Sequence, residues 1–187
     1  MIKRIYAIHG AFSSPLAFNY LRCCFKNGYE WTFLDYHDQT GGLDSIIDHV
    51  EDQDDTCHVI GHSMGGLIAL SLLGRDWVKS VTTVSTPLGG IDISILQSYL
   101  SRSGFMNDIS SHGAFIKRMK DIKTDKPVQH LISNTGFNPW LYEPNDGVVT
   151  IRSQRAVGLG NIHDINANHI EILMANQTVK TLEDFWN

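Results

Sequence analysis

The residues best suited to do chemistry form a short run in the first half of the chain, Gly61-His62-Ser63-Met64-Gly65. This is a G-x-S-x-G pattern, in which a serine occupies a sharp turn between a strand and a helix and its hydroxyl stands above the sheet. Both glycines are needed because a side chain at either position would clash with the neighbouring strand or helix. The pattern therefore predicts that Ser63 is a nucleophile.

The residues on either side of this pattern indicate the strand–turn–helix setting that it requires. Residues 56–60 include His58-Val59-Ile60, a run of the buried-strand type, and residues 66–73 continue as a helix. The N-terminal N–H groups of that helix would point at the serine and favour a developing negative charge. The alternative interpretation is a turn of small residues without chemistry.

A serine hydroxyl is a weak nucleophile until a base takes its proton, and the chain holds nine histidines. Where a serine lies in such a turn, the acid and then the base follow it in the sequence, each in a loop after a late strand. His169 meets this requirement because it follows the last predicted strand and precedes the closing helix. The competitor is His163, which falls inside that strand, where a half-buried structural histidine is the favoured interpretation.

The acid is expected between the fifth strand and His169, and Asn145-Asp146-Gly147 supplies it. A loop position lets the Asp146 carboxylate reach the imidazole, hold its tautomer and stabilise the imidazolium that forms. The competing interpretation is that Asp146-Gly147 is a type I′ turn and nothing more. Asp164, which would follow the last strand, and Glu143, in the same loop, are alternative acids.

A tetrahedral intermediate needs two backbone N–H donors. The first is expected from Met64, the residue after the nucleophile. The second is expected from Ala11, in the loop that follows the first strand and contains His9-Gly10. Phe12, next to Ala11, and His62, the variable position of the turn, are the predicted substrate-binding residues.

Short β-branched runs alternate with amphipathic stretches along the chain, which is typical of a parallel sheet with crossover helices. Strands are predicted at residues 3–8, 31–36, 56–60, 78–84, 128–133 and, more weakly because Gly158 and Gly160 interrupt it, 156–165. Helices are predicted after residue 15 and at residues 43–53, 66–73 and 169–186. The chain contains no repeat or linker, so we expect one domain over residues 1–187.

Residues 88–126 are long for a connection inside a compact domain, where about 2–6 residues are typical. The segment carries large apolar side chains, among them Leu96, Phe105 and Phe115. One interpretation is a helical cap, or pocket wall, over the carboxyl edge of the sheet. The other is a plain crossover helix with an irregular loop.

The composition excludes several classes of function. The formal net charge is -5 and no run of like charges occurs, which argues against a nucleic-acid partner because phosphates require a basic face. No stretch of about 18 apolar residues occurs, so no transmembrane segment is expected. No cluster of ligands at metal-binding spacing is present, and we predict neither a metal nor a cofactor.

The three cysteines, Cys23, Cys24 and Cys57, are a poor disulfide framework because their number is odd and two are adjacent. Reduced thiols and the lack of a signal-peptide pattern in the first residues both favour a cytoplasmic location.

Five segments carry a family resemblance: IHGAFSS, VIGHSMGG, STPLGG, NDGVV and NHIEIL. In this order the chain resembles the α/β-hydrolase superfamily, and more narrowly its small bacterial lipases and esterases. The resemblance implies an α/β fold with a reduced core of about six mostly parallel strands and helices on both faces. It also implies Ser63, Asp146 and His169 as the triad, with Ala11 and Met64 as oxyanion donors.

The resemblance implies a serine hydrolase that cleaves a small-molecule carboxylic ester through an acyl-enzyme intermediate. A thioesterase, an amidase or an acyltransferase would use the same triad. A catalytically silent binding protein is a further alternative, disfavoured because no triad member is missing. The sequence does not indicate the oligomeric state.

Overall fold

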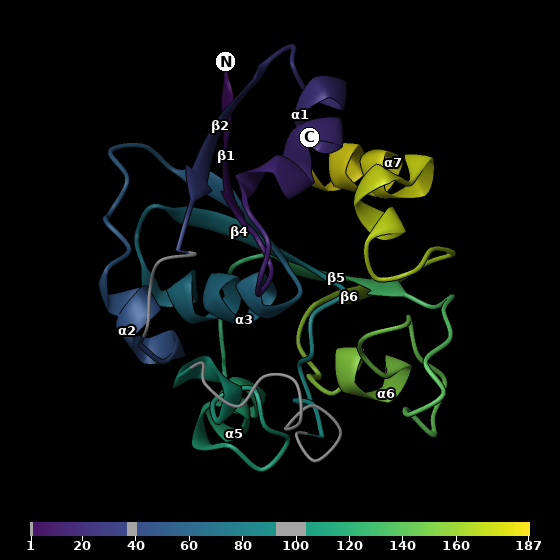
Figure 1. Ribbon diagram of the computed structural model, residues 1–187. Helices are drawn as coiled ribbons and strands as arrows, with labels where there is room; N and C mark the ends of the chain where they lie inside the picture. Colours follow the sequence, from purple (N-terminus) through teal and green to yellow (C-terminus); the bar gives the residue numbers. More distant parts are fainter. Residues whose placement is uncertain (1, 37–40, 93–103) are drawn as a thin grey trace.

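The computed structural model describes residues 2–36, 41–92 and 104–187 of the chain. Six strands form one sheet in the order β2-β1-β3-β4-β5-β6, and every neighbouring pair is parallel (Figure 1). The strands are β1 (Lys3–Ile8), β2 (Tyr29–Leu34), β3 (Cys57–His62), β4 (Val78–Val84), β5 (Val128–Ser133) and β6 (Asn161–Ile165). The predicted sheet of six parallel strands is confirmed.

The chain reverses direction across the sheet between β1 and β3. After β1 it moves outward to β2, and it then returns to β3 and continues in order to β6. The loops that follow β1 and β3 therefore separate at the carboxyl edge of the sheet. In open parallel sheets this is the place where a ligand-binding crevice forms.

Helices cover both faces of the sheet (Figure 1). One face carries α2 (Leu43–Asp48), α3 (Met64–Ser71) and α5 (Ala114–Lys120), and the other carries α1 (Asn19–Cys24) and α7 (Asn176–Trp186). Side chains of β1 alternate between the two cores: Tyr6 packs on the α3 side, and Ile5 and Ala7 pack on the α7 side. This alternation is the two-residue period of a strand that is buried on both faces.

The remaining elements are short. They are η1 (Pro15–Phe18), η2 (Leu72–Gly74), η3 (Gly104–Met106), α6 (Ile151–Gln154) and η4 (Glu171–Met174), where η denotes a 3-10 helix. None of the helices in the described part of the chain is long and apolar enough to cross a membrane.

The described part of residues 88–126 lies on the α3 side of the sheet. Phe115, Ile116 and Met119 of α5 are buried in the same core cluster as α3. Residues 93–103, which include Leu96, lie outside the described residues. The cap over 88–126 therefore stays a prediction, as does the single domain.

Candidate functional site

Ser63 lies in the turn between β3 and α3, and its backbone is strained. Its φ is +53° and its ψ is -125°, a conformation that L-residues rarely adopt. A Cβ on Gly61 would lie 2.2 Å from Gly65 O, and one on Gly65 would lie 2.3 Å from His9 O. Both glycines are therefore required by packing, and the turn is the sharp strand-to-helix elbow that raises a side chain above the sheet.

His169 and Asp146 are brought together from two loops at the same edge of the sheet. His169 follows β6, Asp146 follows β5, and both side chains are buried. His169 Nδ1 lies 2.7 Å from Asp146 Oδ2. Because an ionised carboxylate only accepts hydrogen bonds, Nδ1 carries the proton and Nε2 of the neutral ring keeps a lone pair. This is the tautomer that a general base needs.

Four further donors hold the Asp146 carboxylate. Its Oδ1 accepts from the backbone N–H groups of Val148, at 2.9 Å, and Val149, at 2.7 Å. Its Oδ2 accepts from Ser133 Oγ at 2.5 Å and from Gln154 Nε2 at 3.0 Å. Burial alone would raise the pKa of Asp146, but hydrogen bonds from His169, Ser133 and Val149 outweigh it and hold the pKa below its usual value.

The alternative residues considered from the sequence lie elsewhere. Asp164 forms an ion pair with Arg155, and Glu143 forms one with Arg152 at 2.7 Å. His163 is half-buried on β6. Of the three candidate acids, only Asp146 is hydrogen bonded to His169.

Ser63 and His169 line one cavity of about 610 Å³. Within the described residues, no hydrogen bond joins Ser63 Oγ to His169. A nucleophile and its base are often loosely aligned in a free enzyme and tighten when substrate binds. A second hollow of about 650 Å³ lies beside α3 and the end of α5, holds neither residue and is lined largely by charged and polar side chains.

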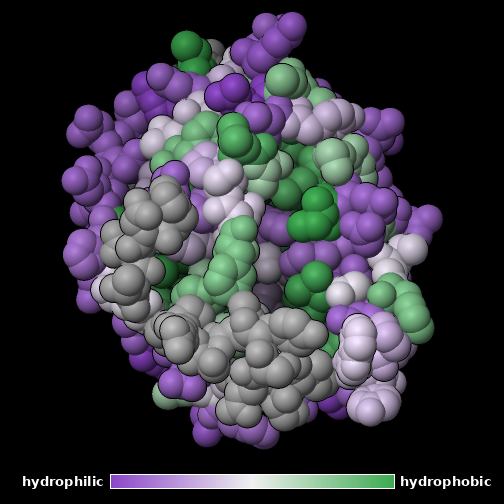
Figure 2. All heavy atoms as spheres, in the orientation of Figure 1, coloured by the Kyte–Doolittle hydropathy of each residue, from purple (hydrophilic) through white to green (hydrophobic). Residues whose placement is uncertain are grey.

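The cavity is apolar around Ser63. Figure 2 shows hydrophobic residues gathered around a hollow in the face of the molecule. Phe12 is 70% exposed and its ring centroid lies 5.6 Å from that of Phe105, so the two form part of the wall. The other apolar lining residues include Leu16, Met64, Ile91, Met106, Ile109, Val148, Ile170 and Met174.

Ala11 and Met64, the predicted backbone donors, are next in sequence to residues at the Ser63 turn. A Cβ on Gly10 would lie 3.0 Å from Ser63 Cβ, so the loop after β1 passes directly beside the serine. Among the hydrogen bonds of the described residues, neither Ala11 N–H nor Met64 N–H has an acceptor. Met64 begins α3, so its N–H also lies at the positive end of that helix.

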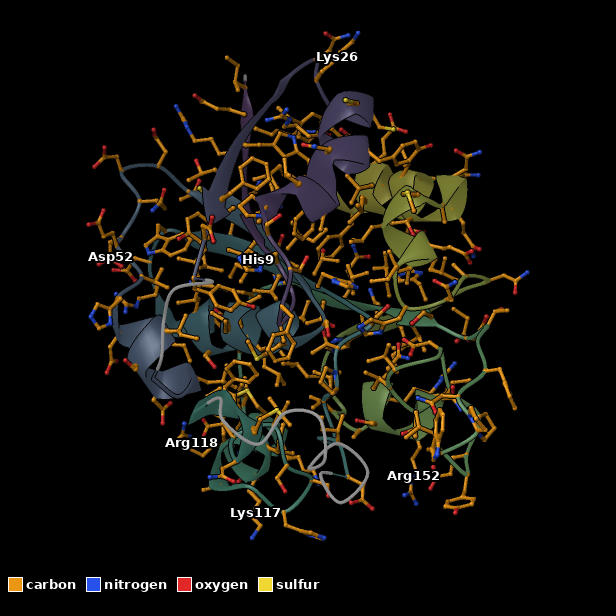
Figure 3. All side chains as sticks on the ribbon, viewed as in Figure 1. His9, Lys26, Asp52, Lys117, Arg118 and Arg152 are labelled. Carbon is orange, nitrogen blue, oxygen red and sulfur yellow. The ribbon has the colours of Figure 1, made fainter. Side chains whose placement is uncertain are left out.

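His9 and Tyr36 hold the loop after β1 in place. In Figure 3, His9 lies in the interior, while the labelled charged side chains lie at the periphery. The His9 ring stacks on Tyr36 with centroids 4.3 Å apart, and Tyr36 donates to His9 O at 2.6 Å. This support was missed from the sequence, as were Ser133 and Gln154. The only feature of the sequence that pointed to this support was the position of His9 between the first strand and Gly10.

His62 lines the cavity, and its ring N–H is hydrogen bonded within the protein. Its Nε2 lies 2.8 Å from His169 O, to which it donates. Burial, with a smaller contribution from His169, lowers the pKa of His62 to about 3, so the ring is neutral. Its Nδ1 is buried without a partner among the described residues. The structure thus gives His62 a contact with the backbone of His169, and its predicted role in substrate binding stays untested.

In the described ranges 2–36, 41–92 and 104–187, no group of three or more His, Cys, Asp or Glu side chains is placed to hold a metal ion.

Solved structures share this architecture at low sequence identity. The lipase BlEst2 of Bacillus licheniformis in its mature form has a TM-score of 0.76 and 18% identity, over 100% of this chain and 92% of that one. A lipase-esterase related protein of Clostridium acetobutylicum has a TM-score of 0.62 and 15% identity, over 98% and 94%. A thioesterase domain of the curacin biosynthetic pathway has a TM-score of 0.61 and 14% identity, over 99% and 90%.

No model of a known protein family matches the chain, and no curated protein matches it by sequence. The structural likeness covers almost the whole chain. The chain therefore has the α/β-hydrolase fold, with a reduced core of six parallel strands like that of bacterial lipases and esterases.

Proposed function

We propose that the protein is a serine hydrolase that cleaves carboxylic esters through an acyl-enzyme intermediate. Ser63 is the nucleophile, His169 the general base and Asp146 the acid that orients it. One observation carries the proposal. A serine in a strained elbow lines the same cavity as a histidine whose Nδ1 is tied to a buried carboxylate 2.7 Å away.

In the acylation step, Ser63 Oγ attacks the carbonyl carbon while His169 Nε2 takes the hydroxyl proton. The N–H groups of Ala11 and Met64 stabilise the oxyanion, and a donor of this kind lowers the barrier by roughly 3–4 kcal/mol. When the intermediate collapses, His169 returns the proton to the leaving alkoxide, and the alcohol departs.

Deacylation repeats these steps with water. His169 takes a proton from the water that attacks the acyl carbon, and when the second tetrahedral intermediate collapses it returns this proton to Ser63 Oγ as the carboxylic acid departs.

The lining of the cavity supports a substrate with an apolar acyl group. Ser63, His62 and His169 are surrounded by aliphatic and aromatic side chains, with Phe12 and Phe105 on one wall. Such a lining gains free energy from buried methylene groups, at about 0.8 kcal/mol each. We therefore expect kcat/KM to rise with acyl chain length until the cavity is filled.

A second candidate activity keeps the acyl-enzyme and changes the bond that is cleaved. The likeness to a thioesterase domain favours a thioester as the alternative substrate. Attack by Ser63 would be the same, and a thiolate would leave in place of an alkoxide. A panel that includes matched thioesters and amides, with and without an added alcohol acceptor, separates esterase, thioesterase, amidase and acyltransferase.

The test is hydrolysis of p-nitrophenyl esters from two to sixteen carbons by the wild type, Ser63→Ala and Ser71→Ala. Ser71 is the matched control because it lies on α3 and its hydroxyl bonds Leu67 O within that helix. We expect Ser63→Ala to lower kcat by roughly 10⁴–10⁶-fold and Ser71→Ala to retain activity. A fluorophosphonate probe should label the wild type and not Ser63→Ala. Equal rates for Ser63→Ala and the wild type would contradict the proposal.

A further inference from the structure

We infer that Ser133 and Gln154 are positioning residues of the proposed hydrolase, which share the charge of Asp146 and thereby set the pH at which His169 stops acting as a base. The inference rests on the proposed function. It concerns residues that do not touch the substrate and act through the acid.

Ser133 stands in a directed chain of hydrogen bonds that ends on Asp146. Its single hydroxyl proton goes to Asp146 Oδ2, 2.5 Å away, because a carboxylate cannot donate. Ser85 Oγ lies 2.7 Å from Ser133 Oγ and must therefore donate to it. The order is Ser85 to Ser133 to Asp146, and all three side chains are buried.

The surroundings of Gln154 fix the orientation of its amide. Its Oε1 accepts from Ser133 N–H at 3.0 Å, and its Nε2 donates to Ser133 O at 3.1 Å. The second N–H of Nε2 donates to Asp146 Oδ2 at 3.0 Å. The amide thus binds both backbone groups of Ser133, and its remaining proton is directed at the acid. The short helix α6, which Thr150 caps at its first turn, ends at this residue.

The first residue of this hydrogen-bond chain, Ser85, has a strained backbone. Ser85, directly after β4, has a φ of +50° although it is not a glycine. Such a conformation persists only where its surroundings over-determine it, and it is concentrated at functional sites. Here it places the Ser85 hydroxyl against Ser133 and its N–H 2.9 Å from Leu131 O.

The donors on Oδ2 compete with His169 for the charge of the carboxylate. If Ser133 loses its hydroxyl, Val148 and Val149 still hold Oδ1, so the carboxylate stays in place. More of its negative charge is then directed at His169, which favours the protonated ring. The loss of kcat/KM at low pH should therefore begin at a higher pH.

The titratable groups near His169 stay unchanged in these variants. The His62 ring on β3 lies 4.9 Å from the His169 ring between centroids, and His9, after β1, acts electrostatically on His62. Glu171, two residues after His169, is exposed and lies near Asn168 N–H. His62 is already neutral, because its pKa is lowered to about 3. The groups that face Asp146 from β5 and α6 are the uncharged Ser133 and Gln154.

The test is the pH profile of kcat/KM for the wild type, Ser133→Ala and Gln154→Met, with Ser80→Ala as control. Ser80 is a buried β4 serine whose hydroxyl lies 2.7 Å from His58 Nδ1, so its loss removes a comparable hydrogen bond away from the site. The acid limb of the profile is the range in which kcat/KM falls as the pH is lowered. We expect the midpoint of this fall to move to higher pH by on the order of 0.5–1 pH unit in Ser133→Ala and Gln154→Met, with KM little changed. Ser80→Ala should lower Tm and leave the limb in place.

An acid limb that is unmoved, or moved to lower pH, in folded Ser133→Ala and Gln154→Met would overturn the inference. If both variants fail to fold while Ser80→Ala folds, the network is structural and the inference also fails. A wild type that neither hydrolyses esters nor reacts with a fluorophosphonate would defeat the proposed function itself. If the wild type is labelled but no ester is cleaved, the pH dependence of the labelling rate replaces kcat/KM.

Discussion

Within the described residues, every group hydrogen bonded to the Asp146 carboxylate is a donor, and this determines what its substitution should do. In Asp146→Asn, the new amide NH₂ must face either the N–H groups of Val148 and Val149 or the donors on Oδ2. With NH₂ toward His169, the ring must present an unprotonated Nδ1, so its proton moves to Nε2 and the base is lost. We expect kcat to fall by roughly 10³–10⁴-fold with a folded protein.

Steady-state kinetics and fluorophosphonate labelling measure this loss. Asp164→Asn is the matched control, because Asp164 is paired with Arg155 and is the acid that the geometry leaves apart from His169. If Asp164→Asn is inactive and Asp146→Asn is not, the assignment of the acid is wrong.

The sequence can indicate a residue when its role leaves a local pattern. Ser63 lies between two glycines that packing requires, and Asp146 and His169 each follow a late strand. Ser133 and Gln154 leave no such pattern because their role depends on contact between β5 and α6, which are far apart in sequence. His62 Nε2 donates to the backbone oxygen of His169, a contact that the sequence did not indicate, and its predicted contact with substrate stays a prediction.

Among the elements, the elbow between β3 and α3 leaves no room for a side chain at Gly65. A Cβ at residue 65 would lie 2.3 Å from the carbonyl oxygens of Ile8 and His9, so Gly65→Ala must separate α3 from β1. We expect a loss of roughly 1–3 kcal/mol in the free energy of unfolding. Activity should fall further than the folded fraction, because the shift moves Ser63 away from Ala11.

Thermal unfolding and kcat, measured together, check this expectation. Gly74→Ala is the matched control, since no atom lies within 4 Å of a Cβ at Gly74. A Gly65→Ala variant as stable and active as Gly74→Ala would contradict the close approach of α3 to β1.

Elements were predictable where packing and pattern agree. The ranges of β1, β4 and β5 match those expected from their β-branched runs. The helix predicted over 43–53 ends at Asp48, although Val50 continues the apolar spacing and is buried without being helical. A periodic spacing of apolar residues therefore indicates which residues are buried, but buried residues at that spacing need not be helical.

The C-terminal part of the chain departs most from expectation. The predicted helix over 169–186 is divided at Ala175, whose backbone is extended, into η4 and α7. Asn168 Oδ1 accepts from the N–H groups of Ile170 and Glu171, and the short 3-10 helix η4 begins at Glu171, two residues after His169. The sixth strand begins only at Asn161, because Gly160 has a φ of +79°.

At the scale of the whole molecule, the parallel sheet follows from the alternation of β-branched and amphipathic runs, whereas the position of β2 outside β1 was not predicted. The cavity wall does not follow from this alternation, because it is assembled from the loop after β1, η3 and the loop before η4. The cytoplasmic location stays a prediction.

Buried histidines should make the folded state sensitive to acid. Burial is the largest cause that lowers the pKa of His58 to about 4 and that of His62 to about 3, and it also lowers the pKa of His130. In the unfolded chain a histidine binds its proton near pH 6.5. Between about pH 6.5 and 4 the unfolded state therefore holds more protons, so stability falls as the pH falls. Asp146, whose pKa is lowered, contributes stability that is lost at still lower pH.

Urea unfolding at a series of pH values from 8 to 4.5 measures this effect. Each buried histidine contributes a slope of up to about 1.4 kcal/mol per pH unit, so we expect a loss of several kcal/mol between pH 7 and pH 5. His58→Gln should reduce the slope, because glutamine can still bond Ser80 and does not titrate. The exposed His112→Gln should leave it unchanged. A free energy of unfolding that is constant from pH 7 to pH 5 would mean that these histidines are not held neutral by burial.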